Sequence, residues 1–131
     1  MSISVQIVTP ERPIFSGPCT EVRAPSALGE IGVLPGHRAL LAALEAGRVL
    51  IQATGGSESY AVSGGFIEVS DDTVTILAEH ALAASDIDTT AVKTLLTEAQ
   101  DALRSMGPSD EAYAATLAKA NWSRAQLLAK S

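Results

Sequence analysis

The stretch Gly29-Glu30-Ile31-Gly32-Val33-Leu34-Pro35-Gly36-His37 carries most of the information about the fold of this chain. Its three glycines and one proline mark backbone positions that tolerate neither a side chain nor a regular hydrogen-bonding pattern. The apolar residues Ile31, Val33 and Leu34 between them require burial. The pattern predicts a tight, partly buried connection in a β-rich domain, which ends in an exposed polar tip at Gly36-His37-Arg38.

On both sides of this stretch, up to about residue 80, the apolar residues have a period of two. Ile3, Val5 and Ile7 alternate with Ser4 and Gln6, which is the pattern of a half-buried strand. Short strands with turns between them at intervals of roughly 8–12 residues are typical of a sandwich or flattened barrel. The expected strands lie around residues 3–7, 14–15, 21–24, 48–53, 60–63, 66–69 and 74–77, with turns at Gly55-Gly56 and Ser70-Asp71-Asp72.

Beyond residue 85 the apolar period becomes helical. The string Ile87-Asp88-Thr89-Thr90 offers N-cap residues for a first helix, which Gly107-Pro108 stops. Ser109 or Asp110 can cap a second helix that runs toward Lys130. Two helices joined by so short a loop lie antiparallel. One face of the first helix carries Val92, Leu95, Leu96, Ala99, Leu103 and Met106.

The two periods together predict an α+β fold. Its N-terminal part, residues 1–85, is an all-β sandwich or flattened barrel, and its C-terminal part, residues 86–131, is an antiparallel α-helical hairpin. The hairpin is too small to bury a sizeable core of its own. We therefore expect the hairpin either to dock on the sandwich or to detach and bind something else.

The composition restricts the possible functions. Hydrophobic residues make up 47% of the chain and aromatic residues only 4%, so the core must consist of Ala, Val, Ile and Leu. The net charge is −6, which argues against nucleic acid as a partner. Cys19 is the only cysteine, which excludes a disulfide framework and fits a reducing compartment. No signal or transit peptide is evident, and the longest apolar run, residues 39–44, falls far short of the ~20 residues that span a bilayer, so we expect a soluble protein without direct membrane insertion.

Motifs that carry catalysis or bind phosphate are absent from the sequence. It contains no phosphate loop, no dinucleotide fingerprint and no Gly-x-Ser-x-Gly nucleophile elbow. His37 and His80 lie far apart and outside metal-ligand spacing, so neither a metal nor a cofactor is expected. The carboxylates that could imitate a catalytic pair occur in turns, where acidic residues serve solvation and capping. The sequence therefore does not predict an enzyme.

Three features of the sequence admit both a structural and a partner-binding interpretation. Gly64-Gly65-Phe66 is either a bend in a strand, with the aromatic ring filling the core, or a point where the backbone of a partner approaches closely. Trp122 either packs within the molecule or anchors a partner protein. Lys119, Arg124 and Lys130 make the end of the second helix basic, which complements the helix dipole and would equally suit an acidic partner.

Five stretches occur in order along the chain. They are Val8-Thr9-Pro10-Glu11-Arg12 with Ile14-Phe15-Ser16-Gly17, residues 22–25 with residues 29–37, residues 43–47, residues 62–69 with residues 74–78, and Ile87-Asp88. In this order and spacing they resemble the epsilon subunit of F-type, proton-translocating ATP synthases. The resemblance covers nearly the whole chain, and its most specific parts are the loop at 29–37 and Ser63-Gly64-Gly65-Phe66.

The resemblance implies a non-catalytic subunit of the central stalk, or rotor, without a cofactor. Such a subunit couples proton flow through the c ring to ATP synthesis in the catalytic head, and its hairpin restrains ATP hydrolysis. The implied partners are the gamma subunit, the c ring and, when the hairpin extends, the beta subunit. The implied location is peripheral, on the cytoplasmic face of the bacterial inner (plasma) membrane. Contact with the c ring and gamma is implied for Glu30, Gly36, His37 and Arg38, and inhibition for Lys119, Trp122, Arg124 and Lys130.

The sequence departs from the family pattern at two places. Some members bind ATP through Ile/Leu-Asp-x-x-Arg-Ala at the start of the first helix. Here Asp88 is present, but Ala91 replaces the arginine and Leu82 replaces an upstream acidic residue, so no nucleotide site is expected. Arg124 falls one residue later than usual, which rotates its charge by about 100° on the helix. An independent ATP-sensing module, with nucleotide between hairpin and sandwich, is the alternative interpretation.

Overall fold

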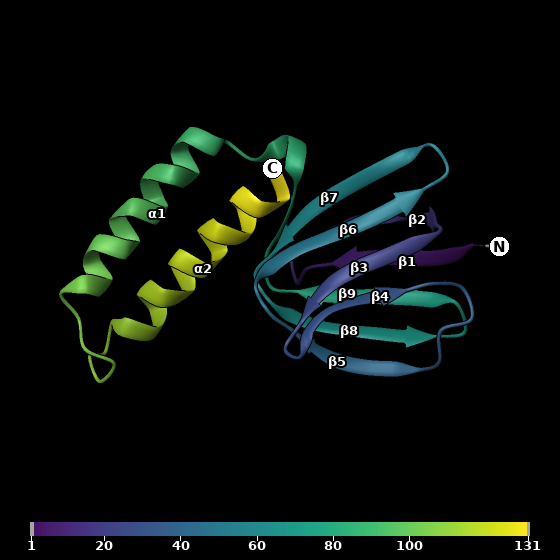
Figure 1. Ribbon diagram of the computed structural model, residues 1–131, viewed down its shortest axis with the longest axis horizontal. Helices are drawn as coiled ribbons and strands as arrows, with labels where there is room; N and C mark the ends of the chain where they lie inside the picture. Colours follow the sequence, from purple (N-terminus) through teal and green to yellow (C-terminus); the bar gives the residue numbers. More distant parts are fainter. Residues whose placement is uncertain (1, 131) are drawn as a thin grey trace.

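The computed structural model describes residues 2–130, which form ten strands followed by a short 3-10 turn and two helices (Figure 1). The strands are β1 Ile3–Val8, β2 Pro13–Cys19, β3 Glu21–Ser26, β4 Gly29–Val33, β5 Leu40–Leu44, β6 Gly47–Ala53, β7 Gly56–Val62, β8 Gly65–Ser70, β9 Thr73–Ala78 and β10 Ala81–Ala83. The 3-10 turn is η1 Ala84–Asp86, and the helices are α1 Thr89–Arg104 and α2 Tyr113–Lys130.

The strands form a nearly closed sandwich, as the alternation of apolar residues predicts. Their spatial order is β10-β7-β6-β3-β5-β8-β9-β1-β2, and β4 pairs with β3 off this path. β1 and β9 pair in parallel, whereas the other paired strands of the described chain run antiparallel. Closing the sheet in this way leaves few free strand edges.

The interior of the sandwich is aliphatic. In β1, Ile3, Val5 and Ile7 are at most 2% exposed, and the paired strand β9 places Val74 and Ile76 beside Val5 and Ile7. The alternate residues of β1 point outward, which is why the sequence of this strand has a period of two. Burial of these side chains supplies the main driving force for folding of the sandwich.

The stretch at 29–37 is only partly a connection. Its first five residues form β4, in register with β3 through pairs such as Val22 with Val33. The turn follows at residues 34–37, so Leu34 lies outside the core and is 55% exposed, contrary to the expectation that it is buried. Leu40–Leu44 also forms a strand, β5, which the sequence did not predict because this run is apolar without alternation.

The helices begin and end close to the expected residues. Asp88 is the N-cap of α1, because its Oδ1 accepts a hydrogen bond from the backbone N–H of Ala91 at 3.1 Å. α1 ends at Arg104, shortly before Gly107-Pro108. α2 starts only at Tyr113, because residues 107–112 form turns in which the side chain of Asp110 caps a turn rather than the helix.

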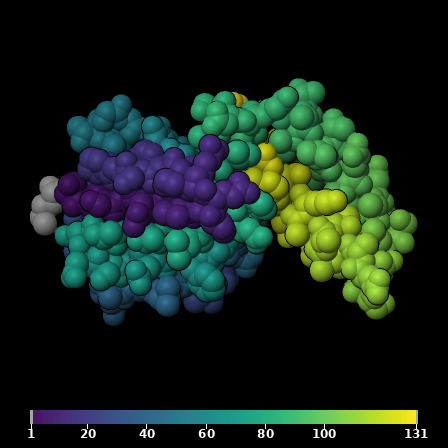
Figure 2. Space-filling model, turned by 180° about the vertical axis from the view of Figure 1, so that it is seen from behind, coloured from purple at the N-terminus to yellow at the C-terminus, as the bar shows by residue number. Residues whose placement is uncertain are grey.

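The hairpin lies against one end of the sandwich. α2 is placed between α1 and the strands β6 and β7, so that α1 forms the outer layer (Figure 1). Seen from behind, the hairpin projects beyond the sandwich and is joined to it over only part of its length (Figure 2). The turn that follows β4 lies at the opposite end of the sandwich from the helices (Figure 1).

Candidate functional site

The turn after β4 is held by one hydrogen bond within the turn and by another from a second loop. Within residues 34–37, the N–H of His37 donates to the carbonyl oxygen of Leu34 at 3.1 Å. Gly36 has a φ of 85°, in the left-handed region that favours glycine. The N–H of Gly36 donates to Oδ1 of Asp72 at 2.8 Å, across to the turn between β8 and β9. Two loops that are far apart in sequence therefore fix one exposed tip.

The predicted contact residues do not all lie in one place. His37 is half-buried, with Nδ1 2.7 Å from the carbonyl oxygen of Arg38, whose side chain is exposed. Glu30 is the second residue of β4, and its carboxylate lies 3.9 Å from the guanidinium of Arg23. The structure thus brings Gly36, His37 and Arg38 together in the tip, whereas most of β4 separates Glu30 from them.

An apolar patch on the outer face of the sandwich was missed by the sequence analysis. Phe66 on β8 is 56% exposed and pairs in register with Ala43 of β5 and Leu77 of β9. Leu77 is 50% exposed, and Leu41, two residues from Ala43 on β5, is 70% exposed. We call Leu41, Phe66 and Leu77 the outer apolar patch. The sequence did contain its signal, since Phe66 alternates with the buried Ile67.

This patch corrects the structural interpretation of Gly64-Gly65-Phe66, because the aromatic ring lies outside the core. The glycines do mark a bend, with φ values of 113° and 140°. A Cβ on Gly65 would collide with the carbonyl oxygen of Leu77, so the backbone that approaches closely belongs to the neighbouring strand β9. The stretch therefore turns Phe66 outward.

A small hydrophobic cluster with alanines at its centre forms the contact between hairpin and sandwich. Ala125 and Ala129 of α2 pack against Ala61 of β7, in a cluster that also includes Ile87 and Val92. This cluster shares no buried residue with the core of the sandwich. Leu82, Trp122 and Leu127 pack against this cluster and add to the limited apolar surface that its alanines bury.

Polar and aromatic contacts complete the docking. Nζ of Lys130 donates to the carbonyl oxygen of Ala84 in η1 at 2.9 Å. The indole of Trp122 lies against the imidazole of His80, which follows β9 in the sandwich. Trp122 therefore packs within the molecule when the hairpin is docked.

The basic residues predicted to be inhibitory do not share one face of α2. Lys119 and Lys130 are separated by three turns and point in directions about 20° apart, whereas Arg124 points about 140° from Lys119. Nη1 of Arg124 donates to Oδ1 of Asn121 at 3.1 Å. In the docked hairpin the three charges therefore form no common patch.

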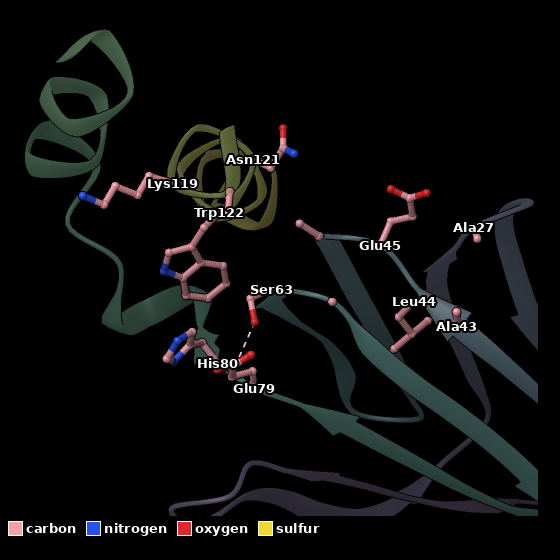
Figure 3. A pocket seen from close by; sticks show the side chains of 13 residues that line it. Ala27, Ala43, Leu44, Glu45, Ser63, Glu79, His80, Lys119, Asn121 and Trp122 are labelled. Carbon is pink, nitrogen blue, oxygen red and sulfur yellow. Dashed lines mark hydrogen bonds between the residues drawn. The ribbon is translucent and has the colours of Figure 1, made fainter. Parts of the chain in front are cut away.

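A crevice of about 640 Å³ opens between α2 and the near end of the sandwich (Figure 3). Its walls include Trp122 and Lys119 of α2 and His80, Glu79 and Glu45 of the sandwich. The backbone N–H of His80 donates to Oγ of Ser63 at 2.9 Å, which fixes the floor of the crevice (Figure 3). Two carboxylates against one ammonium make this space unfavourable for a polyanion such as a nucleotide.

The positions of the ATP-binding motif have structural surroundings in this chain. The carboxylate of Asp88 is used as the N-cap of α1. Ala91 is exposed on the first turn of that helix, and Leu82 on β10 packs against the hydrophobic cluster under the hairpin. None of these side chains offers a positive charge to phosphate.

The titratable groups of the described chain carry little that suggests catalysis. Burial raises the pKa of the Cys19 thiol, so this 2% exposed cysteine behaves as a packed apolar residue. Burial, together with the Glu58 carboxylate that accepts its hydrogen bond, raises the pKa of Tyr60 to about 12. No group of metal-binding side chains occurs among residues 2–130. Neither α1 nor α2 is long and apolar enough to cross a membrane.

Comparison with known proteins finds a family model and relatives that match this chain. The family model described as "ATP synthase, Delta/Epsilon chain, beta-sandwich domain" matches residues 2–84. The ATP synthase epsilon chain of Anaeromyxobacter sp. (strain Fw109-5) is 39% identical over 127 residues, which cover 97% of this chain and 96% of that protein. The epsilon chain of Synechococcus sp. (strain WH7803) is 40% identical over 106 residues, 81% of this chain and 78% of that protein.

A solved structure agrees with these relatives. A chain in the cryo-EM structure of the Euglena gracilis mitochondrial ATP synthase, described as OSCP/F1/c-ring in rotational state 1, superposes with a TM-score of 0.82. The two chains are 26% identical, and the match covers 94% of this chain and 78% of that one. The similarity therefore extends through both the sandwich and the helices.

Proposed function

The chain belongs to the family of ATP synthase epsilon chains, and we propose that it acts as a non-catalytic subunit of the rotor. In this role it couples proton flow through the c ring to ATP synthesis in the catalytic head. It is held peripherally at the cytoplasmic face of a bacterial plasma membrane by its partner subunits. The absence of a phosphate loop and of a nucleophile motif from the sequence supports assignment of the chemistry to other subunits.

The outer apolar patch is the observation that carries this proposal. Leu41, Phe66 and Leu77 are each at least half exposed on one face of the β5-β8-β9 sheet. Contiguous exposed apolar side chains favour a protein-protein contact. We assign this face to the gamma subunit, because gamma is the protein beside which an epsilon chain stands in the rotor.

The tip formed by Gly36, His37 and Arg38 is the proposed contact with the c ring. It is exposed, it carries polar and cationic groups, and hydrogen bonds hold its backbone in one conformation. A preorganised loop loses less conformational entropy on binding than a mobile one. Glu30 lies on β4, the strand that leads into the tip, and is assigned a peripheral part in this contact.

The hairpin is the proposed regulatory element. Its contact with the sandwich belongs to a small hydrophobic cluster that shares no buried residue with the sandwich core, so detachment leaves that core closed. Once extended, the hairpin presents Lys119, Trp122, Arg124 and Lys130 to an acidic segment of the beta subunit and restrains hydrolysis. Release from the sandwich also frees Lys130 from the carbonyl oxygen of Ala84.

Assembly of a truncated chain tests the proposal that the sandwich binds the partner subunits and the hairpin regulates. Residues 1–87 contain the complete sandwich, the outer apolar patch and the tip, so this fragment should fold and join gamma and the c ring on co-expression. The full-length chain is the control. Loss of folding by circular dichroism, or failure of a folded fragment to co-purify with gamma, would contradict the proposal.

We do not propose ATP as the switch in this chain. Asp88 caps α1, Ala91 and Leu82 replace charged motif residues, and the crevice beside α2 carries Glu45 and Glu79. ATP should therefore bind only in the millimolar range, which corresponds to about 4 kcal/mol or less. Calorimetric titration, with Trp122 fluorescence as a second signal, tests this. Saturable micromolar binding would favour the ATP-sensing alternative instead.

A further inference from the structure

The turn between β8 and β9 contains a residue that the turn itself does not require. Asp71 and Asp72 both have positive φ, at 50° and 59°. Two-residue hairpin turns of this type favour asparagine followed by glycine, because a Cβ is strained in the left-handed region. If residue 72 served only the turn between β8 and β9, glycine at this position would therefore make the turn more stable. The carboxylate at that position calls for another explanation.

Asp72 connects three segments of the chain at the end of the sandwich far from the helices. Its Oδ1 accepts the N–H of Gly36 at 2.8 Å, and its carbonyl oxygen accepts the N–H of Ser4 at 2.9 Å. A carboxylate that accepts a backbone N–H forms a charge-assisted bond, which is stronger than a neutral one. Asp72 is half-buried, whereas its neighbour Asp71 is exposed.

The bond to Gly36 controls the direction of the tip. Inside the tip, the N–H of His37 reaches back to the carbonyl oxygen of Leu34, which closes the turn but does not orient it relative to the sandwich. Among the described residues, the carboxylate of Asp72 supplies a hydrogen bond to this turn from a different loop. Because Gly36 directly precedes His37, the same bond sets where the imidazole is presented.

We propose that Asp72 is the positioning residue for the tip, and that it fixes Gly36, His37 and Arg38 in the orientation required for contact with the c ring. This inference rests on the proposed function of the tip. Asp72 itself need not touch the partner. It acts through the backbone of Gly36, and its own φ is strained in the turn between β8 and β9.

Three variants of the full-length chain separate this role from a general structural one. Asp72→Gly keeps or improves the turn and removes the acceptor. Asp72→Asn keeps an oxygen acceptor without the charge. Asp71→Asn alters the same turn at a side chain that forms no hydrogen bond within residues 2–130, and so serves as the matched control.

Nuclear magnetic resonance of the isolated, 15N-labelled chain provides the first measurement. In Asp72→Gly, the amide of Gly36 should exchange with solvent at least tenfold faster and its resonance should shift, with the amides of β8 and β9 unchanged. Asp72→Asn should be intermediate, and Asp71→Asn should match the parent chain. An unchanged Gly36 amide in Asp72→Gly would overturn the inference and leave the proposed function intact.

The second measurement is proton-driven ATP synthesis by the reconstituted holoenzyme. Asp72→Gly should lower the coupled rate severalfold with unchanged thermal stability of the subunit, and Asp72→Asn should restore part of it. His37→Ala, a change in the tip itself, tests the proposed function separately. Normal coupling in His37→Ala would refute the tip as the contact. Impaired His37→Ala with normal Asp72→Gly would refute the positioning role alone.

Discussion

The imidazole of His80 and the indole of Trp122 form a ring contact between the two parts of the chain, with centroids 6.1 Å apart and planes inclined by 37°. His80 lies between β9 and β10 of the sandwich, and Trp122 lies on α2. Trp122 is the only tryptophan, so its fluorescence reports this contact without interference. The pair therefore both stabilises the docked hairpin and provides a way to observe it.

Trp122→Ala should loosen the hairpin without affecting the sandwich. Aromatic ring pairs contribute about 0.5–1.5 kcal/mol beyond the area that they bury, and Trp122 also packs against the hydrophobic cluster under the hairpin. Hydrogen exchange should therefore accelerate in α1 and α2 and stay constant in β1 and β9. His80→Ala should shift the emission of Trp122 to longer wavelength. Lys93→Ala, on the exposed side of α1, is the control and should change neither signal.

The outer apolar patch should be required for assembly and dispensable for folding. Phe66→Ser and Leu41→Ser change exposed side chains, so the free energy of unfolding should change by less than about 0.5 kcal/mol. Co-purification with gamma should be lost, because an apolar contact would acquire unpaired polar groups. Glu68→Gln lies on the same face of β8 and is the matched control. Normal assembly of both serine variants would refute the assignment of this face.

Gly65→Ala should be among the most damaging single changes in the chain. The added Cβ would collide with the backbone of β9 at Leu77, and the φ of 140° is strained for any side chain. We expect a loss of about 4 kcal/mol or more, measured by urea unfolding. Gly55→Ala is the control, since no atom lies within 4 Å of the position of its Cβ. Equal stability of the two variants would show that β8 and β9 are not so closely spaced.

Stability should fall at alkaline pH because of Tyr60. Burial, with Glu58 adding to it, raises the pKa of this phenol to about 12 in the folded chain, against about 10 in an unfolded one. Below pH 10 the group is protonated in both states, so its contribution is complete. Between pH 10 and 12 the unfolded chain loses the proton first and stability decreases, by about 1.4 kcal/mol for each unit of pKa difference.

Tyr60→Phe should remove that part of the pH dependence and leave the stability at neutral pH close to that of the parent. Tyr113→Phe, on α2, provides the comparison for loss of a phenol elsewhere. The measurement is the midpoint of urea unfolding between pH 8 and 12. Parallel curves for the parent and Tyr60→Phe over this range would contradict the expectation.

Replacement of Lys119, Arg124 and Lys130 by alanine should raise ATP hydrolysis by the assembled enzyme. Exposed ion pairs contribute about 0.2–1 kcal/mol each, so loss of three such pairs should increase the rate by about threefold to about 150-fold. Added salt should reduce the difference between variant and parent, because exposed charges are screened. Lys93→Ala removes one charge from α1 and controls for net charge. Equal hydrolysis rates of variant and parent at low salt would mean that these residues only complement the helix dipole and help to dock the hairpin.

Most of the fold could be predicted from the sequence, because the apolar residues have a period of two in its first part and a helical period in its second. The alternation in β1 and the helical spacing beyond residue 85 each have a direct cause in which side chains are buried. β5 escaped prediction because Leu40–Leu44 lacks alternation, although only Leu44 of this strand is fully buried. The start of α2 was misplaced because Asp110 caps a turn as readily as it caps a helix.

The candidate site was less accessible to sequence reasoning. The turn at the tip could be predicted because glycine and proline indicate particular backbone conformations from the local sequence alone. Asp72 was assigned only to its hairpin turn, since its bond to Gly36 joins residues 36 positions apart. The outer apolar patch needed three strands in register before it became a surface. Contacts of this kind depend on the pairing of strands, which no short stretch encodes.

The tip and the hairpin lie at opposite ends of the sandwich (Figure 1). A strand of six residues spans about 20 Å, so partners at the two ends do not compete for space. A subunit anchored at one end and along one face experiences a high effective concentration at its remaining sites. Each separate attachment can then be weak and rapidly reversible while the subunit as a whole stays bound. Under the proposed function, the hairpin can therefore release and rebind while the subunit stays bound, because its dissociation does not depend on that of the tip.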